Sequence, residues 1–196
     1  MTDIKFENDL DRLAYKYGTD KCPQINHCFT PFYYEFLKDK KESIKKVLEL
    51  GIGNEKDMAF CPHYVVGASL FMWRDFFPNA QIYGADILPE TLFKSERIET
   101  FLCDERRPSS LRNLIRQTGS DIDLFIDDGS HMQSNQIFAC KILMPLLQKD
   151  VIYIIEDVRR PEAVMEALNE YDCQLADLTG RRRRNDNLVI VRHKKI

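Results

Sequence analysis

The sequence predicts a doubly wound α/β domain with a Rossmann-like sheet of seven strands that ends in an antiparallel hairpin. First, short apolar runs alternate with helical patterns along most of the chain, which is typical of consecutive parallel βαβ units. Second, several of these runs end in glycine or paired acids, as strands do at the ligand-binding edge of such sheets. Third, the last two runs, 171–176 and 187–193, have no helical pattern between them, which indicates a hairpin.

The composition is that of a globular protein with one core. The chain has 196 residues, of which 44% are hydrophobic and 30% are charged, so we expect a single domain over 1–196. The formal net charge of -3 gives no general attraction to nucleic acid or to an anionic membrane. No apolar run approaches the roughly 20 residues of a membrane span, and the first residues do not resemble a signal peptide. We therefore expect a cytoplasmic protein.

The N-terminal third is expected to be helical before the sheet begins. An apolar stripe over 6–17 predicts a helix that stops at Gly18, and after a loop over 19–30 a second helix is expected from Pro31. The first strand, 46–50, is followed by a long loop over 51–67.

The rest of the chain alternates. Further strands are expected over 81–86, 98–103, 124–126 and 151–155. The helices between them are expected over 68–77, 108–117, 134–148 and 161–170, with a short helical segment near 90–95.

The six cysteines are scattered and form no Cys-x-x-Cys pair, so we expect reduced thiols. A zinc site is the alternative, but the spacing of its candidate ligands matches no known finger pattern. These candidates are Cys22, His27, Cys28, Cys61 and His63.

Acids gather at two strand ends. The run 124–126 leads into Asp127-Asp128-Gly-Ser-His131, and the run 151–155 leads into Glu156-Asp157. Neighbouring strands of a parallel sheet end at the same edge, so these side chains should border one cleft. Several carboxylates and an imidazole together are the composition of a site for a hard cation with a base beside it.

The first three strands end in a pattern that favours a nucleoside-containing cofactor. Glu49, Gly51 and Gly53 form a strand running into a glycine turn, and Asp86 and Asp104 end the next two strands. One such acid could simply favour a turn, but Glu49, Asp86, Asp104 and Asp127 together indicate a binding site. The ligand is expected to be S-adenosylmethionine, because a dozen charged and irregular residues follow Gly53 where a dinucleotide site needs a helix N-terminus.

The chain resembles class I S-adenosylmethionine-dependent methyltransferases, and within them the metal-dependent sugar O-methyltransferases of macrolide biosynthesis. The resemblance rests on stretches that follow in order from about residue 14: 17–21, His27 with the aromatics after it, 47–53, 67–70, 73–80, 82–86, 126–131 and 155–157. Asp-Asp-Gly-Ser-His combined with the later Glu-Asp is the most specific part. Against the longer macrolide enzymes, we expect this chain to differ by the absence of their extra N-terminal region, and loop 54–66 looks individual.

The resemblance implies roles for these residues. Asp128, Glu156 and Asp157 would bind Mg²⁺ or another divalent cation, and His131 would be the general base. Asp127 would either support the metal ligands or contact the cofactor. Thr19, Lys21 and Ser69 lie in matching stretches and join the expected cofactor site, which the helical segment 1–45 would cover.

The expected function is metal-dependent transfer of a methyl group from S-adenosylmethionine to a hydroxyl of a small acceptor, a sugar or glycoside. Two alternatives stay open: a nucleic-acid-directed methyltransferase and a cofactor-binding protein without transfer activity. The basic run Arg181 to Arg184 is expected to be a solvated hairpin tip, with guidance of an anionic substrate or RNA as its other uses. Nucleic acid is the less favoured partner, no membrane partner is expected, and a homo-oligomer is one candidate assembly.

Overall fold

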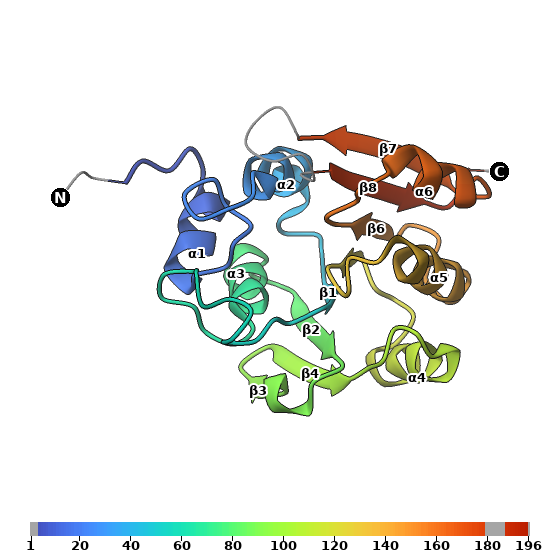
Figure 1. The fold of residues 1–196 in the computed structure, drawn as a ribbon, viewed down its shortest axis with the longest axis horizontal. Coiled ribbons are helices and arrows are strands. Elements are labelled where there is room, and N and C mark those ends of the chain that lie inside the picture. Colours follow the sequence, from blue (N-terminus) through green and yellow to red (C-terminus); the bar gives the residue numbers. More distant parts are fainter. Residues whose placement is uncertain (1–3, 179–186, 196) are drawn as a thin grey trace.

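The computed structural model describes residues 4–178 and 187–195. Its centre is one mixed sheet, drawn in Figure 1. In spatial order the strands are β3 (Lys94–Ser95), β4 (Ile98–Leu102), β2 (Gln81–Asp86), β1 (Lys46–Leu50), β5 (Leu124–Asp127), β6 (Ile152–Ile155), β8 (Asn187–Arg192) and β7 (Asp172–Asp177). The five central strands β4, β2, β1, β5 and β6 are parallel, whereas β8 and β7 form the expected antiparallel hairpin. This confirms the predicted α/β fold class.

Helices cover both faces of the sheet (Figure 1). One layer contains α1 (Asp9–Tyr17), α2 (Phe29–Leu37) and α3 (Ala68–Phe76). The other contains α4 (Pro108–Thr118), α5 (Gln133–Leu143) and α6 (Pro161–Ala167). Each layer has its own apolar core, and strand residues alternate between them: Val47 packs with the first layer and Leu48 with the second. No helix in the described part of the chain is long and apolar enough to cross a membrane.

Helix ends differ from the sequence prediction for local reasons. Helix α1 begins at Asp9 and not at residue 6, because the side chain of Asn8 caps it by accepting a hydrogen bond from the Asp11 amide at 2.9 Å. It ends at Gly18 as predicted, with a φ of 77° there. Helix α5 is shorter than expected, because Pro145 cannot continue the α-helical hydrogen bonds and a 3₁₀ turn, Met144–Leu146, follows.

The segment near residues 90–95 corrects the prediction most clearly. It contains a 3₁₀ turn, Pro89–Thr91, and then strand β3, which pairs antiparallel with β4 through Lys94 and Glu99. Among the described residues the sheet therefore has eight strands and not seven. A two-residue edge strand leaves no periodicity in the sequence from which it could be predicted.

Strand register places the candidate site residues together. Leu50 of β1 pairs with Asp127 of β5, which in turn pairs with Ile155 of β6. The residues that follow these three, Gly51, Asp128 and Glu156, therefore leave the sheet side by side. Strand β1 lies between β2 and β5, which is the switch point where ligands bind in such folds. The predicted hairpin tip, Arg181 to Arg184, lies outside the described residues.

Candidate active site

A cavity of about 560 Å³ opens at this edge of the sheet. Its wall comes from the segment between α1 and α2, from the start of α3, and from the loops after β1, β2, β4, β5 and β6. Eleven of the thirteen residues selected from the sequence line it: Thr19, Lys21, Gly51, Gly53, Ser69, Asp86, Asp104, Asp128, His131, Glu156 and Asp157. Glu49 and Asp127 are fully buried outside this lining.

Gly51 allows two loops to approach each other. Its φ is 94°, and a Cβ atom there would lie 2.0 Å from the backbone oxygen of Asp128. The Asp128 amide also donates to the carbonyl of Leu50 at 2.8 Å. The glycine turn after β1 is therefore packed directly against the loop that carries the Asp-Asp-Gly-Ser-His sequence.

Asp86 holds the same turn from the other side. One carboxylate oxygen accepts a hydrogen bond from the Ile52 amide at 2.8 Å, and the other accepts from the Leu88 amide at 2.9 Å. Asp104, one strand further out, is paired with Arg106 at 2.8 Å and with Arg107 at 3.2 Å. The hydrogen bond from Arg106 is the main reason why the pKa of Asp104 is lowered.

Lys21 lies at the centre of a buried cluster of acids. Its ammonium group is 2.6 Å from Asp128, 2.5 Å from Glu156 and 3.4 Å from Glu49, and the residue is only 1% exposed. Burial alone would lower the pKa of Lys21, but the three carboxylates outweigh it and raise the pKa well above its ordinary value. Lys21 is therefore a fixed internal positive charge.

Aromatic side chains complete this cluster. Tyr33 of α2 donates to the second carboxylate oxygen of Glu156 at 2.5 Å, and Trp73 of α3 donates to Glu49 at 2.8 Å. Burial raises the pKa of Glu156 to about 8 and that of Glu49 to about 7. Both carboxylate oxygens of Glu156 are thus engaged by protein groups.

Three ligand-bearing side chains converge beside the cluster. One ligand atom each from Asp128, His131 and Asp157 lies within 4.8 Å of the others, and no other such group of His, Cys, Asp or Glu occurs among the residues described. His131 Nε2 is 3.2 Å from Asp128, and His131 Nδ1 is 3.8 Å from Asp157. Of the three acids expected to bind metal, Asp128 and Asp157 belong to this group, whereas Glu156 faces Lys21 and Tyr33.

The backbone supports this convergence. His131 and Asp157 both have positive φ values, 55° and 53°, in a region that non-glycine residues rarely adopt. The hydrogen bond with Asp128 is the main cause that raises the pKa of His131 to about 9, and the charges of Asp128 and Asp157 add to it. His131 is also open to the cavity, with 43% of its side chain exposed.

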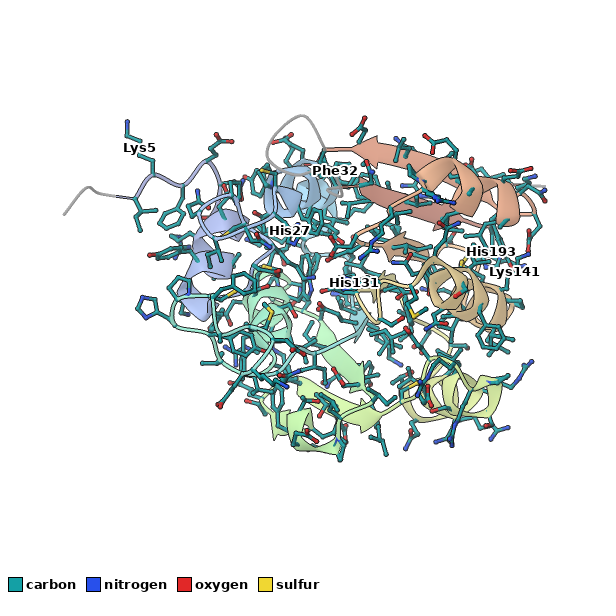
Figure 2. All side chains as sticks on the ribbon, viewed as in Figure 1. Lys5, His27, Phe32, His131, Lys141 and His193 are labelled. Carbon is teal, nitrogen blue, oxygen red and sulfur yellow. The ribbon has the colours of Figure 1, made fainter. Side chains whose placement is uncertain are left out.

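His27 lies near the other carboxylate oxygen of Asp157, Oδ1. Its Nδ1 is 3.9 Å from Asp157, its Nε2 is 3.4 Å from Asp20, and its ring stacks on Phe29. Figure 2 shows His27 and His131 in the middle of the molecule, on different elements. Asp157 therefore lies between two imidazole rings.

The cysteines form no metal site. All six are free thiols, as predicted, and none belongs to the one ligand group found in the described part of the chain. Burial raises the pKa of Cys22 to about 11 and that of Cys61 to about 12, so neither is a reactive thiolate near neutral pH.

Sequence reasoning missed several residues of the site. Glu105 has the same signal as Asp104, because it also follows a predicted strand, and it lines the cavity. Tyr33 and Trp73 lie in two of the predicted helices, but neither was assigned a role in the site. Their hydroxyl and indole groups reach Glu156 and Glu49 through tertiary packing that no spacing in the sequence shows.

Curated relatives match 76% of this chain. It is 35% identical over 150 residues to the mycinamicin VI 2''-O-methyltransferase of Micromonospora griseorubida, of which the match covers 36%. It is 33% identical over 150 residues to the 8-demethyl-8-alpha-L-rhamnosyl tetracenomycin-C 2'-O-methyltransferase of Streptomyces olivaceus, of which the match covers 38%. The chain thus spans well under half the length of these relatives. No family model matches it.

Solved structures agree with this relation. The MycE methyltransferase from the mycinamycin biosynthetic pathway, in complex with Mg, SAH and mycinamycin VI, superposes with a TM-score of 0.78 at 25% identity. The match covers 96% of this chain and 54% of that one. An O-methyltransferase from Bacillus cereus in complex with SAH has a TM-score of 0.62 at 11% identity, covering 98% of this chain and 94% of that one, which shows the fold alone. This chain is therefore a relative of the S-adenosylmethionine-dependent sugar O-methyltransferases of glycosylated natural products, built on the class I methyltransferase fold.

Proposed function

We propose that this protein is a divalent-metal-dependent O-methyltransferase that uses S-adenosylmethionine to methylate a sugar hydroxyl of a glycosylated small molecule. The observation that carries the proposal is the convergence of Asp128, His131 and Asp157 at the cavity that the glycine turn of β1 also lines. A hard-cation site and a base therefore lie where the fold binds its cofactor.

The chemistry of the side chains fits a divalent cation. Asp128 and Asp157 offer carboxylate oxygens, the ligands that Mg²⁺ prefers, and they lie in a cluster with more acids than cationic groups. Asp128 and Asp157 would hold the ion, with Glu156 as the third candidate if its carboxylate turns from Lys21. His131 offers a nitrogen in the same group, which suits a base better than a ligand for Mg²⁺.

The other half of the cavity fits the cofactor. Gly51 and Gly53 line the cavity with φ values of 94° and 76°, so the turn after β1 has a backbone conformation that glycine adopts without strain. Asp86 would accept hydrogen bonds from ribose hydroxyls, and Asp104 lies where the adenine edge would come. Thr19, Lys21 and Ser69 line the same cavity, so we propose that the segment 1–45 contributes its cover. Glu49 and Asp127 would act through their neighbours, because neither lines the cavity.

When bound, S-adenosylmethionine supplies an electrophilic methyl group, and a divalent cation lowers the pKa of a coordinated hydroxyl. His131 accepts the hydroxyl proton at Nδ1, because Nε2 is engaged by Asp128 at 3.2 Å. The hydrogen bond with Asp128 and the nearby acids raise the pKa of His131 to about 9; a cation held by Asp128 and Asp157 would offset these negative charges and favour the neutral imidazole that acts as the base.

The acceptor is proposed to be a glycoside with an apolar body. One of the two relatives described above is named for the methylation of a rhamnosyl tetracenomycin, in which a sugar is attached to a larger natural product. The cavity wall also carries apolar side chains that face solvent, Met132 with 59% exposure and Ile87 with 48%. A sugar hydroxyl could lie beside His131 while the aglycone covers these side chains.

Turnover with a panel of glycosides, followed by release of S-adenosylhomocysteine, tests the proposal. We expect activity on at least one glycoside, and His131→Ala should lose about 10²–10⁴-fold in rate while it still binds S-adenosylhomocysteine. The matched control is His193→Ala, at a histidine that directly follows β8 and does not line the cavity. Cofactor binding without turnover on any glycoside would instead favour a cofactor-binding protein that transfers no methyl group.

A further inference from the structure

Glu105 connects two loops that belong to different strands. It follows β4, yet its Oε1 atom accepts hydrogen bonds from the Ser130 amide at 3.3 Å and from the Asn135 side chain at 3.2 Å. Both donors belong to the segment that follows β5. Strands β2 and β1 lie between β4 and β5, so this carboxylate spans the switch point of the sheet.

The segment after β5, residues 128–135, leaves room for this carboxylate and supplies its donors. A Cβ atom on Gly129 would lie 2.3 Å from Glu105 Oε2, so glycine is needed for the close approach. The Asn135 side chain also donates to the hydroxyl of Ser130 at 2.9 Å. Glu105 is only 8% exposed, and its buried carboxylate oxygen holds the backbone amide of Ser130 and the side chain of Asn135 together.

His131 is the next residue after Ser130. Its backbone is in the left-handed region, with a φ of 55°, which a histidine adopts only when its surroundings determine it. Two features constrain this backbone. The hydrogen bond from the Ser130 amide to Glu105, here called the tether, holds the residue before His131, and α5 begins two residues after it at Gln133. The imidazole is thereby held 3.2 Å from Asp128.

We infer that Glu105 is a positioning residue that holds His131 in its productive orientation. The inference rests on the proposed function, in which His131 takes the proton of the acceptor. Glu105 lines the cavity beside Asp104 but acts on His131 through Ser130 and Asn135, so its loss should lower the rate of proton transfer far more than it weakens the binding of cofactor.

The experiment compares three variants with the intact protein. Glu105→Ala removes the tether, Glu105→Gln keeps an acceptor oxygen for Ser130 and Asn135, and Glu99→Ala is the control at an acid of β4 that pairs with exposed Lys94. We expect Glu105→Ala to lower kcat about 10- to 100-fold, with the Kd for S-adenosylhomocysteine changed less than about twofold. Glu105→Gln should recover most of kcat, and Glu99→Ala should behave as the intact protein does.

Three outcomes would overturn the inference. An unchanged kcat in Glu105→Ala would remove the positioning role. A weakened Kd with normal kcat would make Glu105 a cofactor contact. A Glu105→Gln variant as slow as Glu105→Ala would show that the charge matters and the tether does not. If Glu105→Ala does not fold, Asn135→Ala removes the second donor to the same oxygen without removing a buried charge, and should lower kcat in the same direction.

A measurement without turnover separates this inference from the proposed function. Nuclear magnetic resonance of ring-labelled histidine should show the His131 signals displaced in Glu105→Ala and unchanged in Glu99→Ala, whatever the substrate is. Unchanged His131 signals in Glu105→Ala would refute positioning. If the His131 signals are displaced in Glu105→Ala but the intact protein transfers no methyl group to any acceptor, the proposed function is contradicted and the positioning role of Glu105 is not.

Discussion

Replacing Lys21 with methionine tests the buried charge cluster most severely. The ammonium group is within 2.6 Å of two carboxylates and 3.4 Å from a third, and almost none of the residue is exposed. Methionine fills a similar volume but leaves Asp128, Glu156 and Glu49 without their shared counter-charge. Breaking a buried ion pair by removing one partner costs about 3–5 kcal/mol, and we expect Lys21→Met to fall in this range at pH 8.5.

The effect should depend on pH with a definite sign. The carboxylates raise the pKa of Lys21, so its stabilisation is fully present below about pH 10.4 and is lost only as the pH rises through the folded pKa. Lys21 is therefore charged in the intact protein at both pH 6 and pH 8.5. Glu49 and Glu156, whose pKa values burial raises to about 7 and about 8, are largely protonated at pH 6, so removing Lys21 leaves less uncompensated negative charge there than at pH 8.5. The loss of stability should accordingly be smaller at pH 6 than at pH 8.5.

Urea unfolding followed by circular dichroism, with chelator present, measures this difference. The control is Lys94→Met, which removes an exposed lysine paired with Glu99 at 3.0 Å and should cost less than about 1 kcal/mol. A loss below about 1 kcal/mol for Lys21→Met, or an equal loss at both pH values, would refute the account of Lys21 as a structural counter-charge.

Three further predictions concern the cavity. Gly51→Ala should lower the free energy of unfolding by more than about 2 kcal/mol in urea unfolding, because its Cβ would lie 2.0 Å from the Asp128 oxygen; a neutral effect would contradict the described packing. Asp86→Ala should weaken binding of S-adenosylhomocysteine in calorimetry, and equal affinity would remove Asp86 from the cofactor site. Asp157→Asn should weaken Mn²⁺ binding, measured by electron paramagnetic resonance, while Asp150→Asn should not; equal affinities would move the metal elsewhere.

The sequence was sufficient for the fold class and the place of the site. Acidic residues that directly follow a predicted strand mark the edge of the sheet whatever the tertiary packing is. The sequence therefore allowed four acids to be assigned to one cavity: Asp86, Asp104, Asp128 and Asp157. Edge strand β3 could not be predicted, because two residues carry no periodicity.

The directions in which the side chains of the site point could not be predicted from the sequence. Glu156 and Asp157 are neighbours in one strand end, yet Glu156 faces Lys21 and Tyr33 while Asp157 faces His131. That difference depends on the positive φ of Asp157 and on a lysine delivered from more than a hundred residues earlier. The burial of Lys21 among three acids arises from tertiary packing, and the position of Lys21 in the loop between α1 and α2 does not predict it.

The most direct measurement is transfer of a trideuteromethyl group from labelled S-adenosylmethionine to a glycoside, followed by mass spectrometry of the sugar. We expect the label on a sugar oxygen in the presence of Mg²⁺, no product after chelation, recovery when Mg²⁺ is restored, and no recovery in Asp128→Asn. Labelled product that forms at the same rate in the presence of chelator, or label on a nitrogen or carbon atom, would contradict metal-dependent O-methylation.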